Sequence, residues 1–206
     1  MLSGNPYIII FDYGNVISKP QSAVSINNIV RKLGLKDADH FRQVYSIYRN
    51  EIDAGVITLR EYWEKTLPEI NKVVPEEDLS WLVHEDIVSW ADINEETIRL
   101  IRELKQNDNR LAILSNMVTE TLEYLRKNTS FIGYFDYKFF SCDINMTKPD
   151  PALYKYIMKE MQVIPESCIF IDDIPVNCDA ARALGINTIL FKDIDQTRSE
   201  LKKLIP

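Results

Sequence analysis

The stretch FDYGNVI, residues 11–17, decides the fold of this chain. It follows the apolar run 7–10 (YIII), which predicts a buried strand and places Asp12 at the carboxyl end of that strand. Gly14 and Asn15 then predict a turn. Because open α/β sheets hold their ligands at this end of their strands, Asp12 is the first candidate for a functional side chain.

The composition is typical of a globular protein that is large enough for a full core and one extra subdomain. Of 206 residues, 46% are hydrophobic and 27% are charged. The net charge of −7 without a basic cluster argues against a nucleic-acid partner. No apolar run is long enough to span a membrane, and residues 1–5 do not resemble the start of a signal peptide. Cys142, Cys168 and Cys178 lack zinc-type spacing. We therefore expect a cytoplasmic protein with reduced thiols and, by default, a monomer.

After residue 91, short apolar runs alternate with helical stripes. The runs that predict strands are 111–114, 139–140, 168–171 and 188–191. Asp150 and Pro151 predict the start of one intervening helix, and Gly185 predicts the end of another. This alternation implies a parallel sheet with helical crossovers.

Residues 18–90 differ, because they show helical periodicity and almost no strand signal. One apolar stripe ends at Gly34, and a second runs from Phe41 to Ile52 as one helix. Thr58 and Glu61 have the spacing of a capping box, which predicts the start of a further helix. We expect residues 18–90 to form an inserted helical subdomain above Asp12, and residues 1–17 and 91–206 to form the α/β core.

Polar residues stand at the ends of the predicted strands and before one helix: Asp12, Ser115, Asn116, Lys148, Asp172 and Asp173. Each alone has an ordinary explanation as a turn residue, a helix cap or a solvated lysine. A parallel sheet, however, brings such groups to one edge, where adjacent carboxylates would repel one another. An oxygen-coordinated Mg²⁺ would remove that repulsion and bind phosphate oxygens. The set therefore predicts a site in which Asp12 attacks a phosphoryl group held by Lys148 and its neighbours.

Four segments carry a resemblance to a known family. In order, FDYGNVI, ILSNM, TKPDPALY and FIDDIPVNCDAA resemble the four motifs of the haloacid dehalogenase (HAD) superfamily. The resemblance implies a Rossmann-like three-layer α/β core with a parallel sheet. The insert resembles the small all-helical C1-type cap of that superfamily.

The resemblance also implies a role for each matching residue. It implies Asp12 as nucleophile and Mg²⁺ ligand, the backbone carbonyl of Gly14 and the Asp173 carboxylate as further metal ligands, Asp172 as a neighbouring ligand or orienting group, Ser115 and Asn116 as phosphate-binding residues, and Lys148 as the motif lysine.

Gly14 departs from the family pattern, because most phosphatases of the superfamily have an aspartate there as general acid and base. Such catalysis contributes about 10²–10⁴-fold, or roughly 3–5 kcal/mol of barrier. Anomeric sugar phosphates and acyl phosphates would suffer least, since their leaving oxygens are more acidic. The form FD-x-GNV-I resembles the α-D-glucose-1-phosphate phosphatases. We therefore expect a Mg²⁺-dependent phosphatase of a small phosphorylated metabolite, with an anomeric sugar phosphate as the first candidate.

Two alternatives remain open. A metal-free hydrolase like the 2-haloacid dehalogenases also lacks the second aspartate, but the acidic pair 172–173 suits a metal. A degenerate member would only bind a phospho-ligand or a protein. A proton donor from the helical insert is a further possibility. Its candidates are Arg42, Tyr45, Arg49, Asp53 and Trp63, each of which is better explained as a packing residue, a solvated helix face or a helix end.

Overall fold

The sheet of this protein is entirely parallel. The computed structural model describes residues 7–205, so the expectation for residues 1–5 lies outside the described residues. Its strands are β1 (Ile8–Phe11), β2 (Arg110–Ser115), β3 (Tyr137–Phe140), β4 (Cys168–Asp172) and β5 (Asn187–Leu190), in the order β3-β2-β1-β4-β5. Strand β1 lies in the centre, paired with β2 and β4. Asp12 follows β1 and Asp173 follows β4, so these two residues stand at the ends of neighbouring strands.

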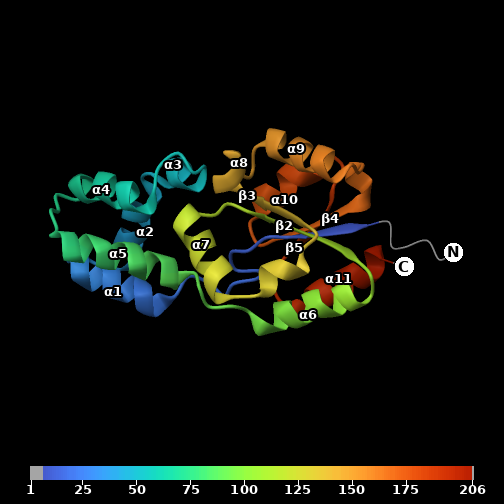
Figure 1. The fold of residues 1–206 in the computed structure, drawn as a ribbon, viewed down its shortest axis with the longest axis horizontal. Helices are drawn as coiled ribbons and strands as arrows, with labels where there is room; N and C mark the ends of the chain where they lie inside the picture. Colours follow the sequence, from blue (N-terminus) through green and yellow to red (C-terminus); the bar gives the residue numbers. More distant parts are fainter. Residues whose placement is uncertain (1–6, 206) are drawn as a thin grey trace.

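Helices cover both faces of the sheet and complete three layers (Figure 1). These helices are α6 (Glu95–Gln106), α7 (Thr119–Asn128), α8 (Ser141–Ile144), α9 (Pro151–Met161), α10 (Pro175–Arg182) and α11 (Ile194–Leu204), with 3₁₀ turns η1 (Phe131–Tyr134) and η2 (Pro165–Ser167). Alternate residues of β1 face opposite layers: Ile9 packs with α6 and α11, and Ile10 packs with α9. The predicted α/β fold with a parallel sheet is confirmed.

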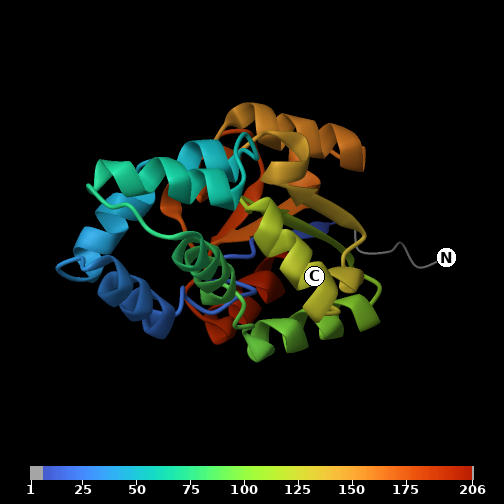
Figure 2. The ribbon, with the colours of Figure 1, turned by 60° about the vertical axis from the view of Figure 1, so that its left-hand side comes forward.

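Five further helices form a group beside the carboxyl ends of the strands (Figures 1 and 2). They are α1 (Ala23–Leu33), α2 (Ala38–Ser46), α3 (Arg49–Asp53), α4 (Leu59–Glu69) and α5 (Glu76–Ser89). Buried side chains from all five of them, including Ile29, Phe41, Ile52, Trp63 and Leu82, pack into a separate apolar cluster. We propose that residues 18–90 are the inserted cap.

The chain enters and leaves this helical group side by side. Ser18 and Ile93 form an antiparallel bridge, and the Asn94 amide donates to the Ile17 carbonyl at 2.8 Å. Two adjacent connections of this kind suit a subdomain inserted between β1 and α6.

Two local predictions need correction. The stripe from Phe41 to Ile52 is two helices, because the Tyr48 backbone (φ −115°, ψ 20°) leaves the helical region between α2 and α3. Helix α10 ends at Arg182, and Gly185 takes its positive φ of 89° in the turn that follows. By contrast, Asp150 does cap α9, and Thr58 with Glu61 forms the predicted capping box of α4.

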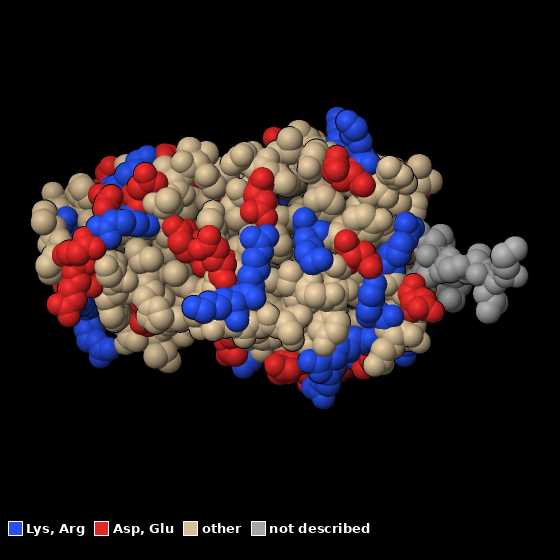
Figure 3. Space-filling model, in the orientation of Figure 1, with Lys and Arg blue, Asp and Glu red and all other residues tan. Residues whose placement is uncertain are grey.

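The surface shows mixed charge on the face drawn in Figure 3, where basic side chains lie beside acidic ones over both parts of the molecule. Within residues 7–205, no helix is long and apolar enough to cross a membrane.

Candidate active site

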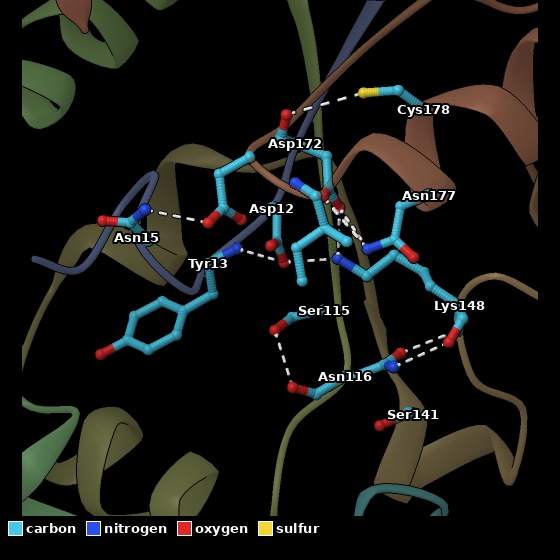
Figure 4. A network of polar contacts seen from close by, with 12 residues as sticks. Asp12, Tyr13, Asn15, Ser115, Asn116, Ser141, Lys148, Asp172, Asn177 and Cys178 are labelled. Atoms are coloured by element: carbon cyan, nitrogen blue, oxygen red, sulfur yellow. Dashed lines mark hydrogen bonds and ion pairs between the residues drawn. The ribbon is translucent and has the colours of Figure 1, made fainter. Parts of the chain in front are cut away.

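A buried lysine joins two carboxylates at the ends of the central strands. Lys148 Nζ lies 2.6 Å from Oδ1 of Asp12 and 2.7 Å from Oδ2 of Asp172 (Figure 4). Asp12 follows β1 directly, and its Oδ1 also accepts a hydrogen bond from the Tyr13 amide at 2.7 Å. None of the three charged side chains is more than 8% exposed. The sequence predicted that Asp12, Lys148 and Asp172 converge, and the structure brings them together.

Burial and charge act against one another in this cluster. Burial raises the pKa of Asp12 to about 7, although Lys148 opposes the shift. Burial alone would lower the pKa of Lys148, but Asp12 and Asp172 outweigh it and hold the pKa above its usual value. Lys148 therefore stays a cation and shields the two carboxylates from each other.

Two asparagines that we did not predict as site residues orient the acidic pair. Asn177 Nδ2 donates to both oxygens of Asp172 at 3.1 Å, and the Ile174 amide donates to Oδ1 at 2.8 Å. Asn15 Nδ2 donates to Oδ2 of Asp173 at 2.9 Å. Asn15 adopts a φ of 55°, a conformation that asparagine tolerates well, and this turn directs its amide across the site. The sequence signals that could have indicated these two roles were an asparagine directly after Gly14 and another five residues after Asp172.

The acidic cluster fits a hard divalent cation. Asp12, Asp172 and Asp173 each offer a carboxylate oxygen, and these oxygens lie within 4.8 Å of one another. With Lys148, three ionised carboxylates would leave a local charge of −2, which Mg²⁺ would balance. The described contacts engage Oδ1 of Asp12 and Oδ2 of Asp173, so the opposite oxygen of each side chain is the one available to a cation.

Ser115 is the last residue of β2 and Asn116 follows it, and the two side chains have different environments. Ser115 is buried, and its hydroxyl donates to the Asn116 carbonyl at a long 3.3 Å, a weak contact that a phosphate oxygen could replace. The Asn116 side chain instead pairs with the Lys148 backbone: its Nδ2 donates to the carbonyl at 3.0 Å, and its Oδ1 accepts from the amide at 2.8 Å. Asn116 therefore fixes the position of Lys148.

A cavity of about 260 Å³ opens above these groups, between the sheet edge and the helical group. Asp12, Gly14, Asn116, Lys148 and Asp173 line its floor, together with Asn15 and Asn177. Tyr13, Trp90, Met117, Val118, Thr121 and Ile174 form much of its wall, and Arg49 and Asp53 reach it from α3.

The five candidate proton donors of the helical insert lie in different environments. Tyr45 and Trp63 are buried packing residues, as expected, and Arg42 is a surface residue paired with Asp39. Arg49 was expected on a solvated face, but its side chain is only 23% exposed and pairs with Asp53 beside the cavity. The sequence pattern missed this because α3 turns away from α2 at Tyr48.

Gly14 has no conformational need to be glycine. Its φ lies outside the left-handed region, and an added Cβ would meet only Trp90, at an ordinary contact distance of 3.8 Å. The absence of a side chain at this position therefore leaves open space in the site beside Asp12.

The fold has three layers, with a parallel sheet between helices, and the site has acidic strand ends around a buried lysine. These features define a class of α/β enzymes whose active site lies at the carboxyl ends of the strands. The family is specific: residues 8–185 match the model of the haloacid dehalogenase-like hydrolases, and the chain belongs to this family. It is therefore a hydrolase, and the resemblance in the four sequence segments is confirmed.

The relatives differ in how much of each protein matches. D-ribitol-5-phosphate phosphatase from Bacteroides thetaiotaomicron is 24% identical over 96% of this chain and 97% of its own length. Bifunctional epoxide hydrolase 2 from Sus scrofa is 37% identical over 71 residues, which are 34% of this chain but only 13% of that protein. A HAD-family enzyme from B. thetaiotaomicron, crystallised with magnesium and inorganic phosphate, superposes with a TM-score of 0.72 and 22% identity, covering 90% of this chain and 94% of its own. This structural likeness shows the shared fold.

Proposed function

We propose that this protein is a Mg²⁺-dependent phosphatase of a small phosphorylated metabolite, acting through a phospho-aspartyl intermediate on Asp12. The observation that carries the proposal is the cluster at the floor of the cavity. There a carboxylate is held by Lys148 and the Tyr13 amide, next to two more carboxylates with an excess of negative charge. Nucleophile, cation site and phosphate-neutralising lysine are the main requirements of phosphoryl transfer.

The chain's own residues divide the work. Asp12 would attack phosphorus through one carboxylate oxygen while the other holds the cation, and Lys148 would offset charge on the phosphoryl oxygens as well as on Asp12. Ser115 and Asn116 would hold a phosphate oxygen through the Ser115 hydroxyl and the Asn116 backbone amide. Asp12, Asp173, the Gly14 carbonyl and either Asp172 or a group that it orients would hold the metal. When bound, Mg²⁺ would neutralise phosphate charge and reduce carboxylate repulsion.

The cavity favours a small leaving group with polar contacts. Its volume of about 260 Å³ suits a pentose or hexose phosphate better than a large lipid or nucleotide. Trp90 supplies an aromatic face, while Arg49 and Asp53 supply hydrogen-bonding groups. We keep anomeric sugar phosphates as first candidates, because Gly14 provides no proton donor. Polyol phosphates come next, since a relative that matches nearly the whole chain is a D-ribitol-5-phosphate phosphatase.

Release of inorganic phosphate from a panel of sugar and polyol phosphates, with and without Mg²⁺, tests this function. The wild type should release phosphate only with Mg²⁺, and Asp12→Asn should abolish release. The matched control is Asp179→Asn, an exposed carboxylate of α10 paired with Arg182, which should behave as wild type. Absence of Mg²⁺-dependent release from every panel member would refute the proposal.

Two further measurements separate the two alternatives. Chloride release from a 2-haloacid without Mg²⁺ would identify a dehalogenase. A protein that binds beryllofluoride and Mg²⁺ through Asp12, with thermal stabilisation but no turnover, would be a phospho-ligand binder. The acidic position 173 favours the phosphatase over the metal-free dehalogenase, because a metal-free site needs no second metal carboxylate.

A further inference from the structure

The proposed reaction needs a proton at the leaving oxygen, and the cavity holds few groups that could supply it. Among the described residues that line the cavity, the titratable side chains are Asp12, Tyr13, Arg49, Asp53, Lys148 and Asp173. Asp12 and Asp173 belong to the nucleophile and cation cluster, and Lys148 is fixed between two carboxylates. Arginine does not give up its proton in proteins.

Tyr13 is also unsuitable as the donor. Its hydroxyl donates to the Trp90 carbonyl at 2.5 Å, and burial holds its pKa well above the usual value. Among the described lining residues, this leaves one carboxyl group as a possible proton donor, that of Asp53 on α3.

We propose that Asp53 is the general acid and base of this site, taking the place of the side chain that Gly14 lacks. The inference rests on the proposed phosphatase function. It also widens the expected substrates, since an acid on the leaving-group side permits ordinary alkyl phosphates as well as anomeric ones.

The backbone around Asp53 is attached to the α/β core, although the residue belongs to the helical group. The Ser141 hydroxyl donates to the Asp53 carbonyl, and it also accepts a hydrogen bond from the Met117 amide at 2.9 Å. Asn145 Nδ2 donates to the Ala54 carbonyl at 2.8 Å. Two residues of the core, at the start and the end of α8, thus hold the backbone of Asp53 and Ala54 against the core.

Close packing at the next glycine strengthens this attachment. Gly55 adopts a φ of 68°, and a Cβ there would lie 2.8 Å from backbone atoms of Cys142. Only glycine permits this approach of the segment after α3 to α8. Catalysis by a general acid depends on its position, and this contact restricts movement of the segment that carries Asp53.

The side chain of Asp53 is held in turn by Arg49. Arg49 Nη2 donates to Oδ1 of Asp53, and the guanidinium lies 4.6 Å from the centroid of the Tyr45 ring. Burial raises the pKa of Asp53 despite the opposing charges of Arg49 on its own helix and Lys148 across the cavity. Such a carboxyl is easier to protonate than a solvated one.

Asp53 would give up a proton in the first step and take one back in the second. As Asp12 forms its bond to phosphorus and the bond from phosphorus to the leaving oxygen breaks, protonated Asp53 gives its proton to that oxygen and becomes a carboxylate. Water then attacks the phospho-aspartyl phosphorus, Asp53 takes one proton from it, and the bond to Asp12 breaks. The cycle returns protonated Asp53, free Asp12 carboxylate and inorganic phosphate.

The test compares leaving groups in Asp53→Asn. With p-nitrophenyl phosphate, whose leaving group needs no proton, kcat/KM should change less than about fivefold. With an alkyl phosphate such as ribitol 5-phosphate it should fall about 10²–10⁴-fold. The matched control is Glu51→Gln, a carboxylate of the same helix that pairs with Lys65 at the surface, and it should change neither value.

Two outcomes would overturn the inference. Equal losses with both substrates would make Asp53 a structural or substrate-binding residue, and an unchanged kcat/KM with both would exclude any catalytic part. If Asp53→Asn fails to fold, the wild type decides: a shallow dependence of kcat/KM on leaving-group pKa supports an acid, and a steep one refutes it. In either case Asp12→Asn tests the phosphatase function separately, because it must abolish release from every substrate.

Discussion

The perturbation that most directly tests the electrostatics of the helical group is Asp86→Asn. Asp86 lies on α5, is only 2% exposed, and accepts a hydrogen bond from the Tyr45 hydroxyl at 2.7 Å. Its Oδ2 has no hydrogen-bond partner in the part of the chain that the structure describes. Burial raises the pKa of Asp86 to about 6, with Arg49 opposing the shift. The side chain is therefore a buried acid whose ionised form the folded state disfavours.

The sign and size of the effect follow from linkage. A carboxyl with a pKa near 3.8 when unfolded and about 6 when folded stabilises the fold below pH 4, and this contribution is lost as pH rises through 6. A shift of about two pKa units corresponds to about 3 kcal/mol. Asparagine does not titrate, so the difference in unfolding free energy, Asp86→Asn minus wild type, should rise by about 3 kcal/mol between pH 4 and pH 7.

Urea denaturation of both proteins at several pH values measures this difference, and other titrating groups cancel in it. Glu76→Gln, at the start of the same helix, is the matched control. A hydrogen bond from Arg60 lowers the pKa of Glu76, so the variant-minus-wild-type difference should fall slightly with pH. A pH-independent difference for Asp86→Asn would refute the reasoning, because it would mean that Asp86 titrates alike in both states.

Three further predictions concern the site and its attachment. Lys148→Met removes the cation between Asp12 and Asp172, so the unfolding free energy should fall by about 3–5 kcal/mol, with partial recovery in Mg²⁺. Urea denaturation with and without Mg²⁺ measures this change, and an unchanged stability would contradict the prediction. Gly14→Asp in an Asp53→Asn background should recover about 10²-fold in kcat/KM with alkyl phosphates, because a side chain fits beside Trp90. No recovery would argue that the reaction does not use an acid at position 14. Gly55→Ala should lower the melting temperature, because of its positive φ and its closeness to Cys142, whereas Gly133→Ala, with nothing within 4 Å of the new Cβ, should be nearly neutral; equal shifts would contradict the close contact.

The core of the fold could be predicted because its signals are local. Each strand is a short apolar run, and its final residues are next to the polar groups that matter. Asp12 follows β1, and Asp172 ends β4. Parallel pairing then brings those ends together without further information. The capping residues Asp150 and Thr58 were equally readable, since each acts on amides within three residues.

The cavity wall could not be predicted, because its contacts join distant parts of the chain. Asp53 is held by Ser141, 88 residues away, and Ala54 by Asn145, 91 residues away. Arg49 looks like a surface residue until the break at Tyr48 redirects α3. Periodicity describes which face of a helix is apolar, but it does not describe how that helix docks.

The proposed nucleophile and the proposed acid stand on elements that are held in the fold in different ways. The proposed nucleophile Asp12 and its neighbour Asp172 stand at the ends of β1 and β4, and moving either would disturb two fully buried strands. The proposed acid, Asp53, stands on a five-residue helix held by a few hydrogen bonds and one close glycine contact. If Asp53 has the proposed role, substitution of this one side chain alters leaving-group preference, and the glycine at position 14 then needs Asp53 to supply the proton for alkyl phosphates. Measured together, Asp53→Asn and the Gly14→Asp, Asp53→Asn pair would show whether the two positions exchange that one task.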